Sequence, residues 1–177
     1  MNMRNQKVRS ELFGEITISD RPIQQRLREP IKCSPYIPTT LEPVRSHELA
    51  AWWPRVVDQV REAIHRGGRL ETAEDVLERL KAADAQLWLI CAPHAVGVIV
   101  TEIFVSSRGR TCAVPIAAGE NLETHIVPVL EKLEQWAAAE GCTRLEGFGR
   151  AGWVRALRPF GWHPLATIIE KDLRHGV

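Results

Sequence analysis

The run from Val96 to Val105 constrains the fold of this chain more than any other feature. Most of its residues are apolar and β-branched, so the run is too apolar for a strand that has one face in water. It therefore predicts a strand at the centre of a sheet. Shorter strand patterns, Gln86–Ala92 and Arg110–Ile116, flank it beyond short turn signals. Together the three segments predict an antiparallel meander.

A long amphipathic helix follows the meander. Apolar residues recur at helical spacing on one face from Leu122 to Glu140, with Pro128 inside the pattern. Asn121 can cap the start of this helix and Gly141 its end. A short strand, Thr143–Phe148, comes next. A strand–helix–strand step of this length predicts a parallel crossover, which is right-handed by rule.

Helical patterns also precede the meander. The first begins at Ser46, contains Pro54 and runs to about His65, so a kink or restart is expected inside it. The second begins at Thr72, with Asp75 three residues on in capping-box spacing. After the last predicted strand of the crossover come a short helix, 153–158, and a closing strand, 165–173.

Residues 1–43 have a different composition from the rest. Five prolines fall within the stretch from Pro22 to Pro43, and such a segment neither pairs in a sheet nor holds a long helix. Short apolar anchors distinguish it from pure disorder, and residues 14–19 alternate like a short strand. We expect an extended N-terminal arm, residues 1–43, before a domain that spans residues 44–177.

The bulk composition narrows the class of protein. The 177 residues carry a net charge of +1, so no global field draws the chain toward nucleic acid or membranes. No apolar run approaches the length of a membrane span, and the first residues lack the apolar core of a signal peptide. The four cysteines and six histidines have no metal-binding spacing, and the cysteines suit a reduced protein. We therefore expect a cytoplasmic protein without a metal site.

The order of elements, the segment Gly149-Arg150-Ala151-Gly152-Trp153 and the later Phe160-Gly161-Trp162 resemble the GNAT superfamily of acetyl-CoA-dependent N-acetyltransferases. The resemblance implies an α/β (α+β) fold, with a mixed and mostly antiparallel sheet flanked by helices. The same segments are similar to small GNAT-like proteins of tailed bacteriophages, a group linked to virion or assembly roles.

The resemblance implies a cofactor loop before the long helix, where backbone N–H groups hold the pyrophosphate of CoA. Only Gly119 matches the glycine pattern of that loop, and the charges of Glu120 and Glu123 would repel phosphates. Pro115 indicates a bulge in the preceding strand, where the family places the acyl group. The candidate cofactor-binding residues are Ala117, Ala118, Gly119, Glu120, Asn121 and Leu122.

The implied chemistry needs a base for the amine and an acid for the departing thiolate. Glu102 and Glu146, within or beside strands, are the candidate bases, unless each is solvated or pairs with an arginine such as Arg144. The family's acid is often a tyrosine. Leu157 takes its place here, and the one tyrosine, Tyr36, lies in the arm.

Two hypotheses about function follow. In the first, the GNAT-like domain has lost its cofactor and serves as a structural component of a phage-type virion or its assembly, with protein partners bound through residues 1–43. Trp52 and Trp53, adjacent on one helix, point in different directions and could add to such an interface or to an oligomer. In the second, the chain is a divergent N-acetyltransferase that uses acetyl-CoA.

Overall fold

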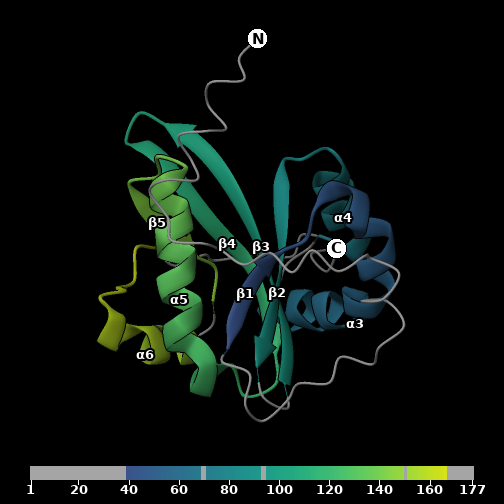
Figure 1. Cartoon of the computed structure of the whole chain (residues 1–177). Helices are drawn as coiled ribbons and strands as arrows, with labels where there is room; N and C mark the ends of the chain where they lie inside the picture. Colours follow the sequence, from purple (N-terminus) through teal and green to yellow (C-terminus); the bar gives the residue numbers. More distant parts are fainter. Residues whose placement is uncertain (1–38, 69–70, 93–94, 150, 167–177) are drawn as a thin grey trace, which may run out of the picture. The chain divides into compact units, whose positions relative to one another are not determined.

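The computed structural model describes residues 39–68, 71–92, 95–149 and 151–166. All of them belong to the second of two compact units, which are Met1–Ile31 and Lys32–Val177. Most of the predicted arm, the short strand pattern at 14–19 and nearly all of the predicted closing strand lie outside the described residues. Five strands in the order β1-β2-β3-β4-β5 form one sheet (Figure 1).

The centre of the sheet confirms the prediction from the apolar runs. β2 (Ala85–Ala92), β3 (Ala95–Ser106) and β4 (Gly109–Gly119) form an antiparallel meander, with β3 in the middle. The crossover is also confirmed, because α5 (Leu122–Ala139) leads from β4 to β5 (Arg144–Gly147), which pairs with β4 in parallel. The sheet is therefore mixed and mostly antiparallel, as expected.

β1 (Thr40–Pro43) corrects the prediction for the end of the arm. We expected residues up to 43 not to enter a sheet, but β1 pairs antiparallel with β2, from Thr40↔Cys91 to Pro43↔Trp88. An edge strand tolerates this composition because one side of its backbone needs no partner, and Pro43 is the last residue of the strand. Leu41, only 2% exposed, anchors β1 in the core.

Helices cover both faces of the sheet. α3 (Leu49–Gly67) and α4 (Ala73–Lys81) cover one face, here called the α3 face, where Leu87, Val98 and Val100 are buried. α5 covers the other, the α5 face, against Trp88, Ile90, Ile99 and Val114 (Figure 1). The side chains of successive residues in each strand point to opposite faces of the sheet. Trp52 and Trp53 both pack partly buried against the core of the α3 face.

The helix ends follow local sequence signals. A 3-10 turn, η1 (Ser46–Glu48), precedes α3, which continues through Pro54 as one helix. The predicted capping box of α4 is present, because the Asp75 N–H donates to Thr72 Oγ1 at 3.2 Å and the Thr72 N–H donates to Asp75 Oδ2 at 2.8 Å. α5 ends at Ala139, and Gly141 follows two residues later with a φ of +77°, which suits glycine.

The segment that carries the family resemblance forms α6 (Ala151–Leu157) and the 3-10 turn η2 (Arg158–Phe160). Its tryptophans pack on glycines at the end of β5. A Cβ on Gly149 would lie 2.9 Å from the Cβ of Trp153, and one on Gly147 would lie 3.3 Å from the ring of Trp162. Packing therefore accounts for the glycines at positions 147 and 149, whereas a Cβ on Gly152 would meet nothing within 4 Å. None of the helices in the described part of the chain is long and apolar enough to cross a membrane.

Candidate cofactor-binding site

A bulge interrupts β4 at the predicted place. Val100 pairs with Ile116 and Glu102 pairs with Ala113, so two steps along β3 correspond to three along β4. Pro115 lies inside this irregular step, where a residue without an N–H removes no regular ladder hydrogen bond. The bulge predicted from Pro115 is confirmed.

β4 and β5 separate just beyond the bulge. The last parallel pair is Val114↔Gly147, and the Phe148 N–H still donates to the Val114 carbonyl at 3.3 Å. β4 continues to Gly119 with no further partner on that side among the described residues. The backbone from Pro115 to Gly119 therefore has an open edge toward the end of β5.

The bulge decides which backbone groups face this open edge. Successive residues of a strand direct their N–H and C=O groups to opposite sides. The backbone groups of Val114 point toward β5, so those of Ala113 point toward β3, where Ala113 pairs with Glu102. Val100 lies two residues before Glu102, so both direct their backbone groups toward β4. Ile116, the partner of Val100, therefore directs its N–H and C=O groups toward β3. Ala117 and Gly119 consequently present their N–H and C=O groups to the open edge.

Gly119 is required by packing. A Cβ at this position would lie 2.8 Å from the Cα of Gly97 on β3 and 3.1 Å from the Leu122 side chain. Its φ of +152° is also rare for residues with a side chain. Gly97 is equally tight, with 2.7 Å from an added Cβ to the Ala118 carbonyl oxygen. The two glycines let β3 and β4 approach closely where the loop leaves the sheet.

The first turn of α5 keeps free N–H donors. Asn121 occupies the N-cap position, but in the left-handed conformation (φ +51°, ψ +34°), and its side chain makes no cap hydrogen bond. The expectation that Asn121 caps the helix is therefore wrong at the level of the side chain. The carbonyl of Asn121 accepts from the N–H of Thr124 at 3.0 Å and from its hydroxyl at 2.7 Å. Such a helix start suits an anion.

The six predicted cofactor-binding residues thus form one continuous turn between β4 and α5. Ala117, Ala118 and Gly119 end the strand, Glu120 and Asn121 form the exposed turn, and Leu122 begins the helix. Thr39 Oγ1 lies 2.9 Å from His125 Nδ1, which ties the start of β1 to the first turn of α5. The exposed Glu120 keeps a negative charge beside the helix start, as the sequence indicated.

Glu102 and Glu146 lie in one row across the sheet. Each is in register with Ala113, from β3 and from β5, so both carboxylates project from the α3 face, about two strand spacings apart (~10 Å). This shared row could not be predicted from the sequence, because it depends on the pairing of three strands. The row lies one residue pair before the point where β4 and β5 separate.

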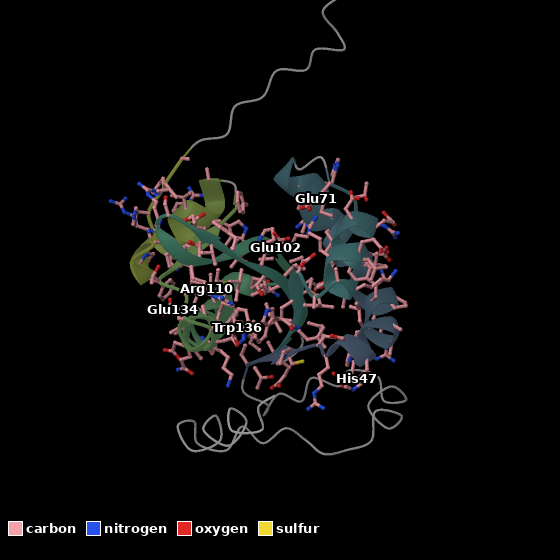
Figure 2. The ribbon with its side chains drawn as sticks, turned by 90° about the horizontal axis from the view of Figure 1, so that it is seen from above. His47, Glu71, Glu102, Arg110, Glu134 and Trp136 are labelled. Carbon is pink, nitrogen blue, oxygen red and sulfur yellow. The ribbon has the colours of Figure 1, made fainter. Side chains whose placement is uncertain are left out.

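Glu102 is engaged in an ion-pair cluster with α4. Its Oε1 lies 2.8 Å from Arg79 Nε, and another Arg79 nitrogen donates to Glu71 Oε2 at 2.5 Å. Figure 2 labels Glu71 and Glu102, which lie near each other in that view. Burial alone would lower the pKa of Arg79, but the hydrogen bond to Glu71 and the charges of both carboxylates raise it overall. The arginine that pairs with Glu102 is thus Arg79, which the sequence analysis missed.

Glu146 is in a different environment. Its side chain is half-buried at the mouth of the open edge, and no described residue forms an ion pair or hydrogen bond with it. Leu157, at the position of the family's acid, is half-buried in α6, and Tyr36 lies outside the described residues. In the part of the chain that the structure describes, no three metal-ligating side chains gather.

No protein-family model and no relative of curated function matches the sequence. Solved structures do match the fold. A GNAT family acetyltransferase from Staphylococcus aureus has a TM-score of 0.51 and 12% identity, over 77% of this chain and 100% of that one. This chain has the GNAT fold. A predicted acetyltransferase from Clostridium acetobutylicum, solved with acetyl-CoA, has a TM-score of 0.54 and 10% identity, over 76% of this chain and 96% of that one.

An aminoglycoside acetyltransferase from an uncultured soil metagenomic sample, solved with sisomicin, matches equally well. Its TM-score is 0.53 and its identity 10%, over 77% of this chain and 97% of that one. Identities this low establish the fold alone. Within the GNAT fold, the bulge at Pro115 agrees with the strand geometry that the resemblance implied.

Proposed function

We propose that this protein binds acetyl-CoA and transfers the acetyl group to an amine. The observation that supports this most strongly is the open edge of β4 directly beside the uncapped start of α5. The fold of the acetyltransferases described above supports the same proposal. They give no support to the first hypothesis from the sequence, a role as a virion component.

The residues around the turn fit a CoA thioester. The amides of Gly119, Asn121 and Leu122 and the first turn of α5 would bind the pyrophosphate, because an uncapped helix start offers N–H donors and a positive dipole end. The Ala117 backbone, on the open edge, would pair with the extended arm of the cofactor. Glu120 opposes binding through its charge, so we expect weaker affinity than a neutral loop would give.

Glu146 is the better of the two candidate bases. It has no described ionic partner, whereas Glu102 is held by Arg79. An amine that approaches from the α3 face would give its proton to the Glu146 carboxylate, directly or through one water. The bound thioester supplies the activated acetyl group, its C–S bond breaks as the C–N bond forms, and the thiolate leaves. Since Leu157 cannot donate a proton, we expect the thiolate to be protonated by solvent.

Calorimetric titration with acetyl-CoA and with free CoA tests the proposal. We expect saturable binding of both ligands, and an increase in affinity of about twofold to fivefold in Glu120→Gln, because a charge that opposes anion binding at a helix start is removed. Glu131→Gln, an exposed residue farther along α5, is the matched control and should bind like the unmodified protein. If millimolar acetyl-CoA gives neither heat nor thermal stabilisation, the proposal is wrong.

A further inference from the structure

The turn between β4 and α5 has a local charge that opposes a polyanion. The chain has no lysine or arginine between Arg110 and Lys132, a stretch that contains the open edge of β4 and the first turns of α5. Two glutamates, Glu120 and Glu123, lie at the turn and the start of the helix. Lys132 follows ten residues after Leu122, or about 15 Å along the helix. The turn is therefore locally negative.

Two neighbouring segments add no lysine or arginine to this turn. They are the start of β3, where Gly97 pairs with Gly119, and Thr39, which contacts the first turn of α5. His125 can become positive in that first turn, but its Nδ1 is already engaged at 2.9 Å from Thr39 Oγ1. Acidic side chains offset the positive end of a helix dipole. The charge of Glu120 therefore takes the role that a bound phosphate would have there.

The open edge of β4, in contrast, is neutral and consists of backbone groups. Ala117 and Gly119 present their N–H and C=O groups to it, about 7 Å apart along the strand. An extended chain that contains amides can pair with such an edge as an added strand does. The pantetheine part of an acyl thioester is a chain of this kind, because it carries two amides and no charge.

CoA attaches further groups to this neutral chain. Its pyrophosphate and its 3′-phosphate together carry about four negative charges at neutral pH. Exposed charges act on one another over roughly 8 Å at physiological ionic strength, so Glu120 repels any phosphate that is held at the turn. The sheet edge therefore attracts one part of acetyl-CoA, and the turn repels another part of the same molecule.

We propose that this site selects its acyl donor through the pantetheine part, and that the donor is a thioester of 4′-phosphopantetheine without the nucleotide of CoA. The inference rests on the proposed function, since it concerns the donor of the same acetyl transfer. The amine nitrogen forms the C–N bond, the C–S bond breaks, and solvent protonates the departing pantetheine thiolate while Glu146 takes the proton of the amine.

Calorimetric titration of the full chain with S-acetylpantetheine, S-acetyl-4′-phosphopantetheine and acetyl-CoA tests the inference. We expect the two shorter donors to bind at least as tightly as acetyl-CoA, to within about threefold. A turn that used the nucleotide phosphates would favour acetyl-CoA by about tenfold or more, because hydrogen bonds to charged groups are strong. Raising KCl from about 20 to about 200 mM should strengthen acetyl-CoA binding, because salt screens the repulsion.

Charge reversal at the turn tests the cause. Glu120→Lys should raise the affinity for acetyl-CoA by about tenfold and leave that for S-acetylpantetheine unchanged. The exposed Glu131, farther along α5, provides the matched control, and Glu131→Lys should change neither affinity. The inference is overturned if Glu120→Lys binds acetyl-CoA like the unmodified protein. It is also overturned if the unmodified protein binds acetyl-CoA more than about threefold more tightly than S-acetyl-4′-phosphopantetheine.

The same titrations separate this inference from the proposed function. If none of the three donors binds at millimolar concentration, the proposed function fails and the inference fails with it. If acetyl-CoA alone binds, the function stands and the inference is overturned. Transfer assays then distinguish the two sources of the donor. A higher rate with acetyl-4′-phosphopantetheine on the serine of an acyl carrier protein assigns the protein-bound source, and an equal or lower rate assigns the free thioester.

Discussion

Two glutamates that are alike in sequence context, Glu102 and Glu146, have different surroundings in the structure. Glu146→Gln should lower the turnover number for acetyl transfer by about a hundredfold to ten-thousandfold, the usual contribution of a general base. The KM for acetyl-CoA should change little, because Glu146 is not part of the turn that we propose as the cofactor site. Steady-state kinetics with an amine acceptor measures both parameters.

Glu102→Gln is the matched control for that experiment. It removes a carboxylate from the same row and the same face, but one that is already paired with Arg79. We expect near-normal turnover and a modest loss of stability, because the ion pair is only partly buried. A large loss of turnover in Glu102→Gln with none in Glu146→Gln would reverse our assignment.

The thiol of Cys112 should lower the free energy of unfolding as the pH rises into the alkaline range. Burial, and to a smaller extent the nearby Cys142, raises its pKa from 9.0 to about 12. Above pH 9 the unfolded chain loses this proton while the folded chain retains it, so unfolding is favoured progressively between pH 9 and about 12. Denaturant titrations across this range should show a smaller loss of unfolding free energy in Cys112→Ala. Cys142→Ala should change the profile less, because burial is the larger cause.

At the residue level, the sequence could identify Gly119 and Pro115 but not their neighbours in space. The loop motif singled out Gly119 for phosphate binding, whereas the structure gives it a second reason, its contact with Gly97 on β3. That contact joins residues far apart in the chain and leaves no local pattern. Arg79, the partner of Glu102, was missed for the same reason.

Among the elements, β1 provides the clearest test of where the domain begins. Deletion of residues 1–43 removes Leu41 and the strand that covers the edge of β2, whereas deletion of residues 1–38 leaves both. We expect the longer deletion to be less stable than the shorter by roughly 2–5 kcal/mol, the usual effect of losing one large buried side chain. Urea denaturation of the two proteins measures the difference.

Equal stability of the two deletions would show that β1 contributes little, and that the domain begins at residue 44 as the sequence suggested. β1 was missed because its stability comes from pairing with β2, not from its own residues. Prolines before it indicated an extended segment, and an extended segment can still pair along one side. The helices were predicted more accurately because periodicity and caps such as Thr72 with Asp75 are local signals.

For the whole molecule, the order of apolar segments predicted the meander and the crossover, and the resemblance to the GNAT superfamily supplied the rest of the expected fold. A β-branched run in the middle of a meander and a helical crossover leave few arrangements of these strands. The site could not be predicted to the same depth. Its geometry depends on which residues share a face after the bulge, and a single extra residue in β4 changes that assignment for Ala117 and Gly119.

The close approach of Gly97 and Gly119 has a consequence for evolutionary comparison. Selection for a folded sheet is sufficient to retain both glycines, whether or not a descendant still transfers acetyl groups. Either glycine could be replaced by a larger residue only if the opposite strand moved away. The two positions should therefore change together in divergent lineages. Retention of glycine at this turn is therefore a sign that the scaffold is preserved, and by itself it is no evidence of acetyl transfer.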